Sequence, residues 1–165
     1  MATTTNYNIL VIGNAGVGKT NLISMLADNE FNRMYIPTQG IETTNIPYKN
    51  ISFNVSEFAG QEQYGFKRKL IEINVNYDAI ILMYDCTSKL SYKNLEYWYN
   101  TINSTMKKQI PMIIVGNKCD VQYIKSDSQR RSYVFEQHNF KFFKISARVN
   151  DNVKEVFDYF YSMLV

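Results

Sequence analysis

Gly13-Asn-Ala-Gly-Val-Gly18-Lys19-Thr20 follows the apolar run 9–12 and precedes the helix-like stretch 21–28. A glycine-rich segment of this spacing, placed between a strand and a helix, is typical of a phosphate-binding loop. The glycines let backbone N–H groups face a phosphate, and the amino end of the helix adds a favourable dipole. Lys19 can reach the β- and γ-phosphates, and the Thr20 hydroxyl can ligate Mg²⁺. The residues expected to bind nucleotide are therefore Gly13, Asn14, Ala15, Gly16, Val17, Gly18, Lys19 and Thr20, although this motif does not distinguish ATP from GTP.

Outside this loop, short apolar runs alternate with helix-like stretches. Most runs are continuous rather than alternating, which is typical of parallel strands buried on both faces, and they cover 9–12, 51–55, 79–84, 112–115 and 142–145. Helices are expected over 21–28, 92–106, 129–138 and 152–164, the last with Asp151 as its N-cap. Residues 29–50 are the least regular region. The alternation predicts a doubly wound α/β fold, in which ligands bind at the carboxyl ends of the strands.

Bulk composition narrows the class of protein. The 165 residues point to one domain, 1–165, and 45% hydrophobic residues suffice for a full core. A net charge of +3 is too weak to indicate nucleic acid or a membrane surface as the main partner. Cys86 and Cys119 lack metal-site spacing, so reduced thiols in a cytoplasmic or nuclear protein are expected.

Two further motifs predict a guanine site. Asn117-Lys-Cys-Asp120 follows the apolar run 112–115, and Ser146-Ala-Arg148 follows the run 142–145. The Asp120 carboxylate can accept from guanine N1–H and the 2-amino group, a pair of donors that adenine lacks. The residues expected to hold the base are Asn117, Lys118, Asp120, Ser146, Ala147 and Arg148, which argues against ATPases and nucleotide kinases.

With these motifs in this order, essentially the whole chain resembles a small GTPase of the Ras superfamily. The resemblance implies a P-loop NTPase G domain with a six-stranded, mostly parallel sheet and helices on both faces. It also implies a monomeric switch that binds GTP or GDP with Mg²⁺, hydrolyses GTP, and works with effectors, an exchange factor and a GTPase-activating protein.

Within the superfamily the chain is more similar to the Ran subfamily, which acts in nuclear transport, than to the Rab subfamily of vesicle traffic. The features behind this preference are Phe53-Asn-Val55, Thr87–Asn94, Trp98 and Ile110-Pro111. Transport receptors would then be partners, in the cytoplasm or the nucleus. The given sequence ends without a cysteine, so no lipid anchor is expected.

The resemblance also assigns roles around the phosphates. Phe31 would stack edge-on against guanine, and Tyr35 would close over the phosphates. Thr38 would sense the γ-phosphate and Mg²⁺, Gly60 would donate its N–H to the γ-phosphate, and Gln61 would orient the attacking water. The implied catalytic residues are Gln61, Lys19 and Thr38, and the implied metal ligands are Thr20, Thr38 and Glu57.

Two departures from the family pattern bear on catalysis. Glu57 stands where the family has an aspartate that holds Mg²⁺ through a water, so it would crowd that water, bind the metal directly or turn away; we expect weakened or rearranged coordination. Ala15 stands where Ras and Ran carry glycine, and its methyl should hinder the closed transition-state arrangement. The alternatives to a Ran-like switch are an adaptor that binds nucleotide with little hydrolysis, and a Rab-like GTPase of vesicle traffic.

Overall fold

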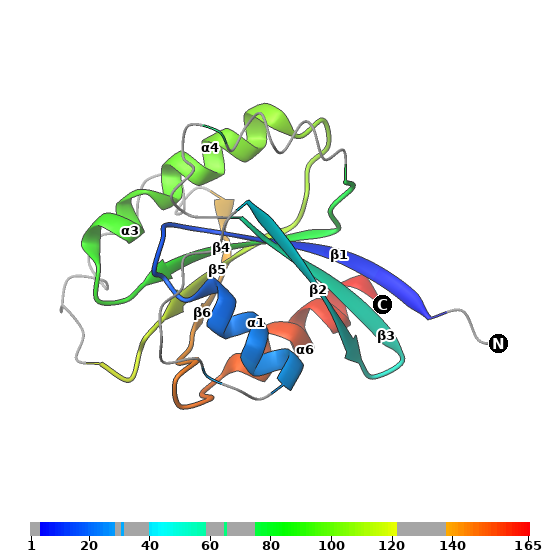
Figure 1. The fold of residues 1–165 in the computed structure, drawn as a ribbon. Coiled ribbons are helices and arrows are strands. Elements are labelled where there is room, and N and C mark those ends of the chain that lie inside the picture. Colours follow the sequence, from blue (N-terminus) through cyan, green and yellow to red (C-terminus); the bar gives the residue numbers. More distant parts are fainter. Residues whose placement is uncertain (1–3, 29–30, 32–39, 59–64, 66–74, 122–137) are drawn as a thin grey trace.

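A six-stranded sheet in the order β2-β3-β1-β4-β5-β6 forms the centre of the computed structural model, which describes residues 4–28, 31, 40–58, 65, 75–121 and 138–165 (Figure 1). The strands are β1 (Thr5–Ile12), β2 (Ile41–Tyr48), β3 (Ile51–Phe58), β4 (Ala79–Asp85), β5 (Met112–Asn117) and β6 (Lys141–Lys144). The pairs β1–β3, β1–β4, β4–β5 and β5–β6 are parallel. All five strands expected from the apolar runs are present, and the expected α/β class is confirmed.

Strand β2 is the one that the apolar pattern did not indicate. It pairs antiparallel with β3 at the edge of the sheet, and only Ile46 of its eight residues is buried. Its outward positions carry polar side chains, and the Thr43 hydroxyl lies 2.8 Å from that of Ser56 on β3. An edge strand with one buried side chain gives no apolar run, which is why the region looked irregular.

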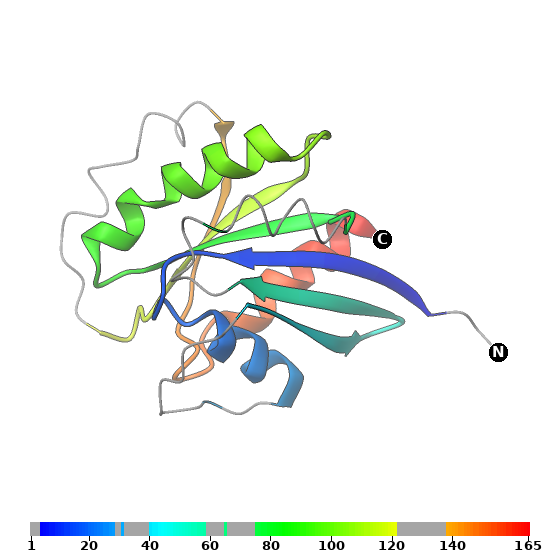
Figure 2. The same cartoon turned by 45° about the horizontal axis from the view of Figure 1, so that its top comes forward.

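The helices lie on both faces of the sheet, with α1 (Lys19–Asp28) and α6 (Val153–Leu164) on one side and α3 (Lys89–Lys93) and α4 (Leu95–Thr105) on the other (Figures 1 and 2). One helix was expected over 92–106, but the structure has two, which meet at Asn94. Ser88 caps α3 by accepting a bond from the backbone N–H of Ser91. The helix expected over 129–138 lies outside the described residues except for His138.

Helix α6 begins differently from the expectation. Asp151 is not its N-cap; that position is taken by Asn152, which has φ 56° and makes no side-chain capping bond. Asp151 instead pairs its backbone with Ser146 in both directions, at 3.0 and 2.9 Å. The backbone of Asp151 therefore positions the Ser146 loop, and the helix starts one residue later.

Each face of the sheet buries its own apolar cluster. Under α1 and α6 the cluster contains Leu22, Val55, Ile81 and Phe157, and under α4 it contains Leu10, Leu82, Trp98 and Ile102. Alternate residues of β1 and β4 serve the two clusters, as expected for strands covered on both faces. Within the described part of the chain, no helix is both long and apolar enough to span a membrane.

Phe157 is the test of this packing, since it is fully buried and its ring centroid lies 5.7 Å from that of Phe53. Phe157→Ala should lower the free energy of unfolding by about 3–5 kcal/mol, because it removes buried apolar area and leaves a cavity. Leu90→Ala is the matched control: Leu90 is 64% exposed, and its loss should change stability by about 0.5 kcal/mol or less. Urea unfolding measures both, and equal effects would contradict the packing described.

Candidate functional site

The glycine-rich loop leaves the carboxyl end of β1 at the centre of the sheet and turns into α1. Gly18 has φ 99°, and a Cβ there would collide with the side-chain amide of Asn117, so both the conformation and the space require glycine. Gly16 has φ 77°, and a Cβ built on it meets no atom within 4 Å. The middle of the loop is therefore open to a ligand, while its second half is packed against the end of β5.

Lys19 opens α1 but points back into the loop. Its Nζ donates to the carbonyl oxygens of Gly13 and Asn14, both at 3.0 Å. The side chain is only 6% exposed. Burial lowers the pKa of Lys19 to about 8, and the nearby Glu57 carboxylate partly offsets this effect. The loop thus holds a desolvated ammonium group where a phosphate would face it.

Glu57, near the end of β3, turns into the same site. Its Oε2 accepts a hydrogen bond of 2.9 Å from the Thr20 hydroxyl, and the side chain is buried. Burial raises the pKa of Glu57, although Thr20 and Lys19 both favour its ionised form. Of the three possibilities left by the sequence, the structure removes one: Glu57 does not turn away from the site.

Asn117, the last residue of β5, joins two loops. Its Nδ2 donates to the carbonyl of Val17 at 3.0 Å, and its Oδ1 accepts from the backbone N–H of Ala147 at 3.1 Å. The side chain is 3% exposed. Asn117 was expected among the residues that hold the base, and in this structure both ends of its amide bond to the protein.

Lys118 adds a second link to the phosphate loop and connects it to the end of β4. Its Nζ donates to the Gly16 carbonyl at 2.8 Å and pairs with Asp85 Oδ2 at 2.7 Å. Burial opposes ionisation of Asp85, but the bonds from Lys118 and Thr87 outweigh it, and the pKa of Asp85 is lowered. Sequence reasoning did not select Asp85; its place at the end of β4, beside the other motifs, was the available signal.

Asp120 is exposed at the rim, and its Oδ1 accepts a 2.7 Å bond from the Ser146 hydroxyl. That contact brings together the two motifs expected to hold the base. Ser146 and Ala147 are buried, whereas Arg148 is exposed. The carboxylate of Asp120 is therefore oriented by a fixed neighbour and still open to solvent.

Trp98 is a residue of the site, although in the sequence it counted only as a feature of the subfamily resemblance. It is 1% exposed, and its indole N–H donates to the Asn14 side-chain oxygen at 3.0 Å. Helix α4 thereby fixes the start of the phosphate loop from the opposite face of the sheet. The contact spans 84 positions of the sequence, so no local pattern could reveal it.

The remaining predicted residues divide into two groups. Phe31 is half-buried and packs against the cluster beneath α1 and α6. The other four residues, and therefore their predicted roles, lie outside the described part of the chain: Tyr35, Thr38, Gly60 and Gln61.

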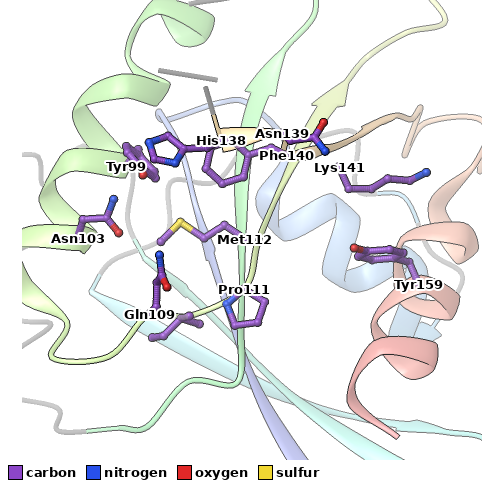
Figure 3. A pocket seen from close by; sticks show the side chains of 11 residues that line it. Tyr99, Asn103, Gln109, Pro111, Met112, His138, Asn139, Phe140, Lys141 and Tyr159 are labelled. Atoms are coloured by element: carbon purple, nitrogen blue, oxygen red, sulfur yellow. The ribbon is translucent and has the colours of Figure 1, made fainter. Parts of the chain in front are cut away.

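A separate shallow hollow lies at the other end of the sheet (Figure 3). It is lined in part by Tyr99, Met112, Phe140 and Tyr159, and two of its lining residues, 112 and 141, begin strands β5 and β6. The phosphate and base motifs all follow the carboxyl ends of strands. This hollow is therefore not part of the nucleotide site.

Comparison with known proteins identifies the family. The protein-family model described as "Ras family" matches residues 8–164 of this chain. Ras-related protein Rab-13 of Bos taurus is 35% identical over 156 residues, covering 92% of this chain and 76% of the relative. Rab-3C of Bos taurus is 34% identical over 159 residues, covering 92% and 68%. GTP-binding nuclear protein Ran of Giardia intestinalis is 29% identical over 170 residues, covering 89% and 73%.

The family match, the six-stranded sheet and the loop geometry agree with one another. The chain belongs to the Ras family of small GTPases, which are GTP-hydrolysing molecular switches with the P-loop GTPase fold.

Proposed function

We propose that this chain binds GTP and GDP, with Mg²⁺, at the carboxyl ends of β1, β3 and β5, and that Glu57 and Ala15 alter how it holds the metal and hydrolyses GTP. The observation that carries the proposal is the meeting of three segments at Asn117. Its own segment at the end of β5 is bonded through its side chain to Val17 of the phosphate loop and to Ala147 of the loop after β6. Loops joined in this way can place a phosphate chain and a base in one fixed relation.

Guanine selection would come from Asp120. A carboxylate offers about four lone-pair positions, and the Ser146 hydroxyl uses one of them. The rest can accept from guanine N1–H and the 2-amino group. Ser146 keeps the carboxylate from rotating, so less ordering is needed when the base binds.

The phosphates fit the buried Lys19 ammonium and the amino end of α1. A buried cation with a lowered pKa gains from a nearby anion, because the anion supplies the charge partner that solvent cannot. The backbone around Gly16 is open to a ligand, as its free space shows. Binding of phosphate would thus stabilise the charged form of Lys19.

The donor set near Lys19 also fits Mg²⁺. Mg²⁺ takes six oxygen ligands at 2.0–2.1 Å, which places neighbouring ligand oxygens about 2.9 Å apart. Thr20 Oγ1 and Glu57 Oε2 are 2.9 Å apart. The spacing fits two ligands of one octahedral cation, and it is also that of an ordinary hydrogen bond. The ground for proposing direct ligation and rearranged coordination is the side chain of Glu57, which is one methylene longer than the family aspartate. When bound, Mg²⁺ neutralises charge that develops on the phosphates.

Hydrolysis would follow the family pattern, with Gln61 orienting water and Thr38 and Gly60 contacting the γ-phosphate. These roles stay predictions. Ala15 is exposed in the loop between Asn14 and the open Gly16. A methyl group at that position occupies space that the family leaves for the closed catalytic arrangement, so slow hydrolysis and a weak response to a GTPase-activating protein are expected. If hydrolysis is negligible, the chain is a nucleotide-binding adaptor.

The subfamily is a finer proposal. Sequence motifs favoured a Ran-like role in nuclear transport, with transport receptors as partners. Identity is higher to Rab-13, at 35%, than to the Giardia Ran protein, at 29%. The Rab-like alternative, with effectors in vesicle traffic, is therefore at least as well supported, and in either case an exchange factor, an effector and a GTPase-activating protein are the expected partners.

Base recognition can be tested with inosine diphosphate, which lacks the 2-amino group of GDP. The unaltered protein should prefer GDP over inosine diphosphate by about 10- to 100-fold, because inosine diphosphate loses the hydrogen bond from the 2-amino group to the charged Asp120 carboxylate. Asp120→Ala should remove this preference as well as weaken GDP binding. Glu155→Ala, which deletes an exposed carboxylate on α6, should keep it. Competition against a fluorescent GDP analogue measures the affinities of all three proteins for both nucleotides; a preference retained in Asp120→Ala would contradict the assignment.

Metal coordination can be tested by loading the GDP complex with Mn²⁺ and counting bound waters from the line broadening that ¹⁷O-water causes in its electron paramagnetic resonance spectrum. Glu57→Asp, one methylene shorter, should hold the metal through a water. We expect its complex to contain one more metal-bound water than that of the unaltered protein. An equal count in the two proteins would show that Glu57 does not ligate directly.

The effect of Ala15 can be measured as a single-turnover rate of GTP hydrolysis with Mg²⁺. Ala15→Gly should raise the rate by about tenfold or more, which corresponds to about 1.4 kcal/mol of barrier. GDP affinity should change little, because the methyl group is compatible with the ground state. An unchanged rate would refute the proposed obstruction.

A further inference from the structure

Two thiols lie in contact at the Asn117–Asp120 motif, one of the two motifs expected to hold guanine. The sulfur atoms of Cys86 and Cys119 are 2.9 Å apart, although 33 positions separate them in the sequence. Both are thiols in this structure. A disulfide bond is about 2.05 Å long, so the two sulfurs need to approach by about 0.9 Å to become bonded.

The backbone holds the two cysteines in place. Cys86 follows β4, and its N–H donates to the Asn117 carbonyl at 2.9 Å. Cys119 follows β5, and its N–H donates to the Ile145 carbonyl at 3.1 Å. Parallel strands β4 and β5 end side by side, with Asp85 paired to Asn117, and Cys86 is the first residue after β4 while Cys119 is the second after β5. The proximity is therefore built into the sheet.

Gly116 provides the room for this contact. A Cβ on Gly116 would lie 2.8 Å from the Cys86 sulfur and 2.7 Å from the Tyr84 hydroxyl oxygen. A larger residue at this position would have to displace the Cys86 sulfur, the Tyr84 ring or both. Cys86 is 4% exposed, whereas Cys119 is half-buried. A dissolved reagent would therefore reach Cys119 first.

We propose that Cys86 and Cys119 are a redox-modification site, at which exchange with a small-molecule disulfide forms an intramolecular disulfide that loosens the hold on guanine nucleotide. The Cys119 thiol gives its proton to solvent, and the thiolate attacks one sulfur of the reagent, releasing one small thiol and leaving a mixed disulfide. The Cys86 thiol then loses its proton and attacks Cys119 Sγ, releasing the second small thiol. Two protein thiols are oxidised and one reagent disulfide is reduced to two thiols.

The expected effect on nucleotide follows from the neighbours of the pair. Cys119 stands between Lys118, which bonds to Gly16, and Asp120, which bonds to Ser146. Cys86 follows Asp85, the ion-pair partner of Lys118. Drawing the two sulfurs together moves both segments that position the base-binding carboxylate. This consequence rests on the guanine-nucleotide binding proposed above, whereas formation of the disulfide does not.

The bond itself is tested by treating the reduced protein with oxidised glutathione and measuring its mass. We expect a loss of two hydrogen atoms, no glutathione adduct, and a linked peptide pair that contains Cys86 and Cys119. Cys86→Ser should instead keep one glutathione on Cys119, because the mixed disulfide cannot be resolved. An unresolved adduct on the unaltered protein, or no reaction, would overturn the proposal.

The consequence is tested on the same samples by the release of a fluorescent GDP analogue. The disulfide form should release it about tenfold faster than the reduced form, and dithiothreitol should restore the slow rate. Reduced Cys86→Ser should release it at the rate of the reduced unaltered protein. A linked protein with an unchanged release rate would overturn the regulatory part. If the reduced protein holds no GDP, the proposed function fails, while the mass measurement still decides whether the disulfide forms.

Discussion

The buried amide of Asn117 is the interaction on which the site depends. It lies at the end of β5 and bonds to the phosphate loop with one end and to the loop after β6 with the other. Neither partner is a side chain, so the geometry is set by backbone positions that mutation of a neighbour would not easily change. A buried polar group of this kind costs stability unless both ends are satisfied. Here both are, which rigidly fixes the distance between the loops.

The charges of the site are arranged around the same point. Lys19 and Glu57 are both buried, and burial disfavours the charged form of each while the other partly compensates. The protein therefore keeps an ammonium group and a carboxylate poorly solvated in a place where phosphate and a divalent cation would complement them. Perturbed ionisation of this kind is common at functional sites.

Much of this arrangement was predictable from sequence, for definable reasons. The central strands are continuous apolar runs, and the three motifs follow their carboxyl ends, so fold and location could be inferred together. Strand β2 was missed because seven of its eight residues are not buried. Asp151 was wrongly expected to cap α6. Asp151 and Asn152 are adjacent and both are common N-cap residue types, so the sequence pattern could not show which of them precedes the helix. The contact of Trp98 with Asn14 joins distant segments, so only the folded chain could show it. Glu57 and Thr20 were expected at one metal site from the family resemblance, and the folded chain adds the hydrogen bond between them.

The two edges of the sheet have a consequence for association. On β2, Pro47 has no backbone N–H to offer a further strand, and Glu42, Thr43 and Asn45 are exposed. At the other edge, β6 has only four residues, with exposed lysines at both ends. Short edges, charges and proline all discourage the pairing of strands between molecules. Neither edge strand of this six-stranded sheet therefore favours pairing with a strand of another molecule. Molecules at high concentration should have little tendency to associate edge to edge.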